Sequence, residues 1–113
     1  MSVISFIGRV EKPTLRIFAN KPCLMFDVIE EYEYRFQGEI KTNKTAIPVK
    51  LWGKQADEYN NYIQAGQTVY IEGRLSITRK RSDQTGEYNT FVSVEPNLNG
   101  LRIITNPVTP EIM

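Results

Sequence analysis

The sequence predicts an all-β protein, a small barrel of five strands with one short helix between strands three and four. Two observations carry this prediction. Short runs rich in β-branched and aromatic residues recur between turn-forming residues, and most of them alternate between apolar and polar side chains. A single segment in the middle of the chain has the three- and four-residue apolar spacing of a helix.

The first two strands are expected on either side of a turn at residues 20–22. The first covers residues 3–9 and resumes at residues 15–18. Pro13 interrupts it, because proline donates no ladder hydrogen bond and marks an edge or a bend. Residues 23–30 form the second strand.

The third strand, residues 45–52, is the most informative one. Alternation turns its aliphatic side chains toward the core and leaves Lys50 and Trp52 on the outer face. An outward tryptophan beside a lysine is unusual unless something covers the ring. The cover is either a ligand or, in the simpler alternative, an oligomer interface or a loop.

A helix is predicted at residues 54–63, where Ala56, Tyr59 and Ile63 fall on one face. A short helix at this point can close the open end of a five-stranded barrel. Tyr59 and Tyr62 are therefore expected to pack against the barrel rather than to contact a ligand.

Alternation resumes in the fourth strand, residues 68–78. Its apolar series, which includes Leu75 and Ile77, is expected to face inward, with Gly73 at a bend. Residues 88–95 return as the fifth strand.

Two long hairpin arms interrupt the strands, one with its tip at residues 37–39 and one at residues 79–87. Residues 101–104 can close the sheet. The 113 residues suffice for one hydrophobic core. We therefore expect a single barrel domain over residues 1–105 and a short flexible C-terminal tail over residues 106–113.

The composition excludes several classes of function. The chain has no histidine and one cysteine, Cys23, so the commonest general base is missing and no intramolecular disulfide can form. Cys23 has apolar neighbours and is expected in the core. No spacing of residues is typical of catalysis, and we expect no enzyme activity, metal or cofactor. Without an apolar run of about 18 residues or a signal peptide, we expect a cytoplasmic protein with no membrane contact.

Charge is nearly balanced overall but unevenly distributed. The net charge is +1, from 14 basic and 13 acidic residues. Acids dominate residues 27–39, whereas residues 41–54 and 74–81 carry basic charges alone. The fold can bring the two basic segments together into a stripe that attracts a polyanion. Taken singly, each run is more simply explained as solvated surface.

Five strands, a helix after the third and two long arms form the layout of an oligonucleotide/oligosaccharide-binding fold, whose second and third strands and flanking loops bind ligand. Unpaired bases stack on aromatic rings, and cations neutralise the phosphates between them. Such residues meet on this layout: Lys50, Trp52, the arm aromatics Tyr32, Tyr34 and Phe36, and the arm cations Arg79, Lys80 and Arg81. The arm aromatics alternate and share one side, which is either a binding platform or a partner interface.

Several runs resemble the bacterial single-stranded DNA-binding protein family. They are VKLWGK at 49–54, VYIEGRL at 69–75 and TRKRSDQTG at 78–86, and the opening strand is similar too. The resemblance extends over roughly residues 2–104. It implies a barrel that is commonly tetrameric and coats single-stranded DNA during replication, recombination and repair without catalysis.

Residue by residue, the resemblance assigns base stacking to Trp52 and Tyr32. It assigns basic contacts to Lys54, Arg79 and Lys80.

Three departures from the family pattern alter these expectations. Ala46 and Arg81 stand where the family has stacking tryptophans, so binding is expected to be weaker or more electrostatic. Tyr34, Phe36 or Phe91 could compensate. The family's long C-terminal segment with an acidic tip is missing, so recruitment of replication or recombination proteins by that tail is not expected. A compact version of this kind suits a phage homologue.

The sequence therefore predicts a non-enzymatic, largely sequence-independent single-stranded DNA-binding protein. Strand edges in such barrels often pair between subunits, so we expect a homo-oligomer, a tetramer by resemblance, with the outward Tyr70 at an interface. The alternative is a protein-interaction barrel, such as a primosome-type accessory factor, that binds DNA weakly. Replacing Trp52 by alanine separates the two, because only the first loses substantial DNA affinity.

Overall fold

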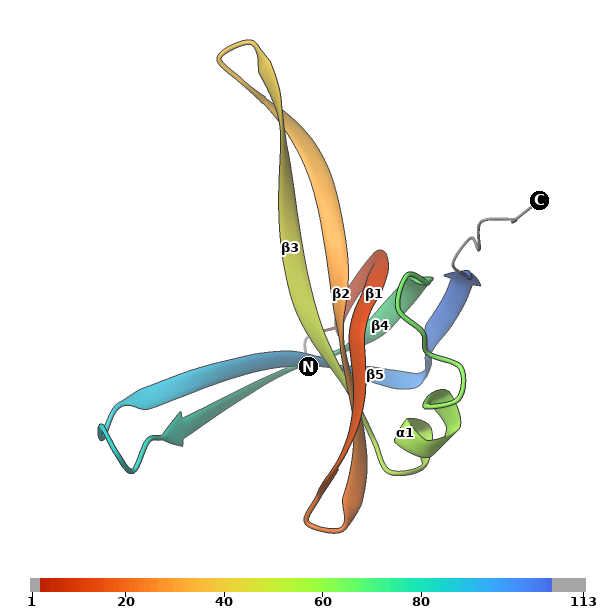
Figure 1. Cartoon of the computed structure of the whole chain (residues 1–113), viewed down its shortest axis with the longest axis vertical. Coiled ribbons are helices and arrows are strands. Elements are labelled where there is room, and N and C mark those ends of the chain that lie inside the picture. Colours follow the sequence, from red (N-terminus) through yellow and green to blue (C-terminus); the bar gives the residue numbers. More distant parts are fainter. Residues whose placement is uncertain (1–2, 107–113) are drawn as a thin grey trace, which may run out of the picture.

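Five long strands and one helix lie within residues 3–106, the part of the chain that this computed structural model describes (Figure 1). In chain order they are β1 (Val3–Phe18), β2 (Lys21–Phe36), β3 (Glu39–Trp52), α1 (Lys54–Tyr59), β4 (Thr68–Arg81) and β5 (Tyr88–Thr105). The strands close into a barrel in the order β1-β2-β3-β5-β4. The predicted oligonucleotide-binding barrel with one helix between strands three and four is confirmed.

β1 closes the barrel because its two halves pair with different strands. Residues 3–9 pair antiparallel with β4, and residues 9–18 pair antiparallel with β2. The register shifts between Glu11 and Thr14, on either side of Pro13. The proline therefore bends one continuous strand, where the sequence predicted an interruption.

The core fills the barrel with side chains from every strand and from the segment after β3. Alternation along β3 turns Val49 and Leu51 inward, as predicted, and leaves Trp52 outside. The buried cluster consists of Phe6, Val10, Leu24, Phe26, Val28, Val49, Leu51, Ala56, Ile63, Val69, Ile71, Val94 and Leu101.

The helix is shorter than residues 54–63, the range that the sequence predicted. α1 ends at Tyr59, and the backbone N–H groups of Tyr62 and Ile63 both donate to its carbonyl oxygen, at 2.9 and 2.8 Å. This tight turn still places Ile63 in the core, and the partly buried Tyr59 packs against the core cluster. Tyr62 is exposed, so the prediction that it packs against the barrel is wrong.

Three hairpins project from the barrel in different directions (Figure 1). The β2–β3 arm (residues 30–45) points to the top of the view, and the β4–β5 arm (residues 74–95) points to the left. The β1–β2 hairpin (residues 14–25) points to the bottom. Both predicted arms are present. The predicted tail lies outside the described residues, except for Asn106.

β4 leaves the barrel at Gly73. The register of β4 against β5 shifts between Ile71 and Gly73, and a Cβ atom at Gly73 would overlap the carbonyl oxygen of Glu95. Only glycine permits this close crossing. Beyond it Leu75 and Ile77 stay on the inward side of the strand but are exposed. The prediction that they are core residues is wrong, because the sheet here continues past the end of the barrel.

Candidate nucleic-acid interface

A groove of about 400 Å³, which we call the aromatic groove, lies between the barrel and one face of the β4–β5 arm. The end of β3 and the β1–β2 hairpin form one wall, and the two strands of the arm form the other. The lining residues are Phe18, Lys50, Trp52, Thr78, Lys80 and Phe91. Three rings and two cations therefore meet around one hollow.

Trp52 projects outward because it alternates with the core residues of β3, as the sequence predicted. It is 39 % exposed, and its ring packs against Phe18 with centroids 6.0 Å apart and planes tilted by 57°. A tilted ring contact of this kind restricts the orientation of both rings. Phe18 is a groove residue that sequence reasoning missed, because no pattern within β1 shows that the hairpin brings it to β3.

Backbone geometry fixes Trp52 at the end of its strand. Gly53 has φ +63° and ψ −128°, a conformation that L side chains rarely adopt, and its N–H donates to the carbonyl oxygen of Pro22 at 2.9 Å. The chain turns sharply there and starts α1. Lys54, a predicted phosphate contact, is the first residue of that helix.

The β4–β5 arm contributes one of its two faces to the aromatic groove. Thr78 pairs directly with Phe91, and Lys80 follows two residues later on the same face. Arg79 and Arg81 therefore lie on the reverse face. The structure divides the three predicted cations, bringing Lys80 to Trp52 and leaving the two arginines on the other side of the arm.

The guanidinium of Arg79 has an aromatic partner of its own. Its central carbon lies 5.1 Å from the centroid of the Tyr88 ring, within the range of a cation–π contact.

A second hollow, the β1 groove, continues from the aromatic groove across the outer face of the barrel. It measures about 220 Å³ and shares Lys50 with the first. β1 contributes Lys12, Thr14 and Arg16 to its wall, and Asp27 is the one acid among the lining residues that the structure describes. The basic side chains of Lys12 and Arg16 therefore continue the positively charged surface beyond Lys50 and Trp52. Sequence reasoning did not single out Lys12 or Arg16, whose importance depends on the bend of β1.

Tyr32, Tyr34 and Phe36 lie elsewhere, along the β2–β3 arm. Trp52 pairs with Cys23, and the register runs without a shift to the arm tip, so these three even-numbered residues occupy the opposite face of the β2–β3 ladder. The two tyrosine rings are 6.3 Å apart. The structure therefore does not bring the predicted arm aromatics into the aromatic groove.

Polar partners hold two of these arm rings. The Tyr32 hydroxyl accepts a hydrogen bond from Asn43 Nδ2 at 2.8 Å. The Nζ atom of Lys41 lies 5.0 Å from the Phe36 ring centroid.

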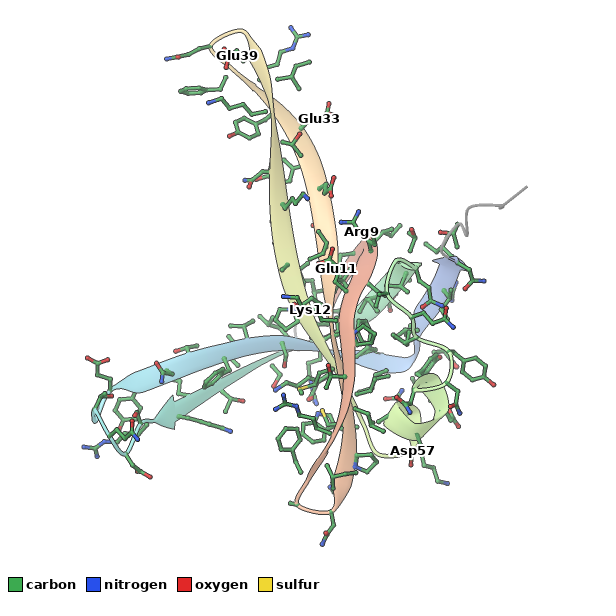
Figure 2. All side chains as sticks on the ribbon, viewed as in Figure 1. Arg9, Glu11, Lys12, Glu33, Glu39 and Asp57 are labelled. Carbon is green, nitrogen blue, oxygen red and sulfur yellow. The ribbon has the colours of Figure 1, made fainter. Side chains whose placement is uncertain are left out.

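Ion pairs connect β1 to the base of the β2–β3 arm. Arg9 lies 3.3 Å from both Glu11 and Glu31, and Lys44 lies 3.6 Å from Glu31. Figure 2 shows Arg9 and Glu11 where β1 passes this arm, with Glu33 farther along it. Part of the acidic charge that opposes a phosphate backbone is therefore neutralised within the protein.

The outer face of β1 and β4 carries Tyr70, the predicted interface residue. Tyr70 pairs with Ile7, which is exposed, and its hydroxyl donates to Glu72 Oε2 at 2.9 Å. Tyr70, Ile7 and Glu72 are not among the described lining residues of either groove.

Cys23 is fully buried beside Trp52 in the β2–β3 ladder. Burial raises the pKa of its thiol, and the nearby charge of Lys50 lowers it by a smaller amount. The prediction that this cysteine is buried is confirmed.

Two further observations concern metals and membranes. Among residues 3–106, no group of three or more His, Cys, Asp or Glu side chains is placed to hold a metal ion. No helix in the same residues has the length and apolar character needed to span a membrane.

Residues 1–99 match the model of the family described as "Single-strand binding protein family". The chain belongs to this family. A single-stranded DNA-binding protein of Clostridium tetani is 31% identical over 94 residues, which cover 81% of this chain and 65% of that protein. Single-stranded DNA-binding protein 2 of Clostridium acetobutylicum is 32% identical over 97 residues, covering 84% and 73%. The resemblance found in the sequence is confirmed.

Solved structures share the fold. A Plasmodium falciparum SSB in complex with ssDNA has a TM-score of 0.75 at 17% identity, covering 92% of this chain and 93% of that one. A deletion mutant of the single-stranded DNA binding protein from Thermus aquaticus has a TM-score of 0.74 at 20% identity, covering 93% and 51%. The chain therefore shares its fold with these two solved structures.

Proposed function

We propose that this chain binds single-stranded DNA with little sequence preference and catalyses no reaction. Membership of the single-strand binding protein family supports the ligand. The observation that carries the mechanism is the half-exposed ring of Trp52 in one groove with Lys50 and Lys80. A base stacks on the ring, and the lysines neutralise the phosphates on either side.

The two grooves give the strand a path along the outer face of the barrel. Lys50 belongs to both, so a backbone leaving Trp52 meets Lys12 and Arg16 next. Lys54 adds positive charge at the start of α1, and Arg79 and Arg81 add it on the reverse face of the β4–β5 arm, away from this path. Tyr32, Tyr34 and Phe36 offer a second aromatic contact region on the β2–β3 arm.

We also propose that the protein works as a homo-oligomer, a tetramer like other members of its family, with Tyr70 and Ile7 in an interface on the outer face of β1 and β4. In this form it coats single-stranded DNA exposed in replication, recombination and repair, in the cytoplasm of a bacterium or an infected host. A phage origin stays a prediction.

The test is quenching of the fluorescence of Trp52, the only tryptophan, by a thymidine oligonucleotide at several salt concentrations. We expect strong quenching whose affinity falls steeply with salt, because each phosphate contact releases counterions. Trp52→Ala, followed with a labelled oligonucleotide, is expected to weaken binding roughly 5- to 150-fold, the equivalent of about 1–3 kcal/mol for one stacked base.

Exposed Tyr62, on the turn after α1, supplies the control variant Tyr62→Ala. It should bind like the unmodified protein. A flat titration, together with unchanged binding by Trp52→Ala, would favour the protein-interaction barrel instead.

A further inference from the structure

Phe18 and Phe91 are exposed aromatic side chains that the core does not use. They are 44 % and 50 % exposed, and both line the aromatic groove. We propose that these two rings, with Trp52, form a clamp that holds one unpaired nucleobase between the barrel and the β4–β5 arm. This inference rests on the proposed function and deepens it, because it assigns base contacts on both sides of the groove.

The barrel wall of the clamp is the Phe18–Trp52 pair. The tilt of 57° between the rings sets Phe18 against Trp52 without stacking the two face to face. Phe18 thereby restricts the orientation of Trp52 while leaving part of the tryptophan open to a ligand. Phe18 is the last residue of β1, next to the turn of the hairpin, and it is not among the residues of the buried core cluster.

The arm wall of the clamp is Phe91. Its direct pairing with Thr78 places it on the groove face of the β4–β5 arm, together with Lys80. The apolar series Leu75 and Ile77 occupies the reverse face. The ring of Phe91 is therefore separate from that apolar series, and it lines a hollow whose other wall is also aromatic.

The chemistry of the groove selects its occupant. Its described lining residues are three aromatic residues, two lysines and a threonine, and none of these described residues is acidic. A planar ring flanked by negative charge can stack on the aromatic rings and pair with the lysines. A nucleotide of a single strand is such a ligand. A base inside a duplex has both faces covered by its neighbours, so two facing aromatic walls favour an unpaired, unstacked base. The volume of about 400 Å³ lies within the range of roughly 300–1,000 Å³ that is common for small-ligand sites.

A double-mutant cycle tests the clamp. Phe18→Ala, Phe91→Ala and the double variant are compared by the anisotropy of a labelled thymidine oligonucleotide at fixed salt. Each single variant is expected to weaken binding about fivefold or more. The double variant should weaken it by much less than the product of the two, because both rings contact the same base.

Neighbouring residues supply matched controls. Ile17 and Val92 are exposed, adjacent to the two phenylalanines, and on the opposite faces of their strands. Ile17→Ala and Val92→Ala should bind like the unmodified protein. Phe18→Leu and Phe91→Leu retain apolar bulk without a ring, and should weaken binding as the alanine variants do.

The outcomes separate this inference from the function on which it depends. If the unmodified protein binds and Trp52→Ala weakens binding, while the phenylalanine variants bind like their controls, the clamp is wrong and the function stands. Effects of Phe18→Ala and Phe91→Ala that multiply would also overturn the clamp, since they would mean two independent contacts. If the unmodified protein does not bind single-stranded DNA, the proposed function itself fails.

Discussion

Gly53 is the residue that ends β3 and thereby sets the position of the Trp52 ring. Its backbone conformation, φ +63° and ψ −128°, is open to glycine and strained for other residues. Among the described residues other than its two chain neighbours, a Cβ atom at position 53 would meet no atom within 4 Å, so the cost of Gly53→Ala comes from the backbone conformation.

Gly53→Ala is therefore expected to lower the free energy of unfolding by about 1–3 kcal/mol. Urea denaturation followed by circular dichroism measures this change, with Lys54→Ala as the neighbouring control. An unchanged midpoint would show that the turn into α1 tolerates a side chain.

The Cys23 thiol is expected to react slowly. It is fully buried, and burial raises its pKa, so the thiolate that attacks reagents is scarce and out of reach. Labelling at pH 8 should be slow in the folded protein and fast in concentrated urea, as measured by mass spectrometry. Equally fast labelling in both conditions would mean that the β2–β3 ladder beside Trp52 opens readily.

Sequence reasoning placed single residues correctly where a local rule decides their position. Alternation in β3 was enough to place Lys50 and Trp52 outside and Val49 and Leu51 inside. Phe18 was missed because its contact with Trp52 depends on how two hairpins pack, which no local pattern contains.

At the scale of elements, the β4–β5 arm has two chemically different faces. Lys80 lies in the aromatic groove, while Arg81 lies on the reverse face. The sequence showed an unbroken run of cations. Which of them face the groove and which lie on the reverse face became clear only from the pairing of β4 with β5.

Lys80→Ala is expected to reduce the dependence of binding on salt by about 0.7 in the slope of log affinity against log salt, the value for one phosphate on a single strand. Arg81→Ala, which removes the same charge from the other face, should leave the slope nearly unchanged. Titrations at four or more salt concentrations measure both slopes. Equal reductions would show that the strand contacts both faces of the arm.

A second prediction concerns the ion pairs at the base of the β2–β3 arm. Glu31→Gln removes a negative charge and releases Arg9 and Lys44 from their partner. Single-stranded DNA should bind a fewfold more tightly at low salt, while stability changes by less than about 1 kcal/mol because these pairs are exposed.

Glu58→Gln on α1 makes the same change of net charge away from the arm and is the control. Oligonucleotide titration and urea denaturation measure both variants. Weaker binding by Glu31→Gln would mean that the ion pairs hold the arm in its binding position.

The limits of pattern reading are clearest in β4 beyond Gly73. The alternation of Leu75 and Ile77 correctly gave their common face, but alternation does not tell whether another part of the molecule covers that face. The predicted helix was too long for a similar reason. The apolar spacing extends to Ile63, but a turn after Tyr59 places the Ile63 side chain in the core just as a longer helix would.

At the scale of the whole molecule, the fold class followed from the sequence because the number of strands, the turns and the inserted helix agree with one barrel. The directions of the three projecting hairpins did not follow, since they depend on the bend of β1 and the crossing at Gly73. The proposed binding surface combines the barrel with two of these hairpins, so its composition could be only partly anticipated.

The proposed subunit interface predicts the effect of a charge on the outer face of β1 and β4. Ile7→Arg should lower the oligomeric mass measured by light scattering after gel filtration, because an interface core excludes an unpaired charge. Ile17→Arg, on the exposed β1–β2 hairpin, is the control and should keep the mass. An unchanged mass for Ile7→Arg would place the interface elsewhere.

The double pairing of β1 also constrains how the chain folds during its synthesis. The first residues of β1 can pair only once β4 has been synthesised. Val69 of β4 in turn pairs with Ile103, near the end of β5. The three hairpins are local and can form early, but the barrel can close only after nearly the whole chain has left the ribosome. Contacts between such distant parts of the chain slow folding, so closure is expected on the millisecond-to-second scale of other small β-barrels.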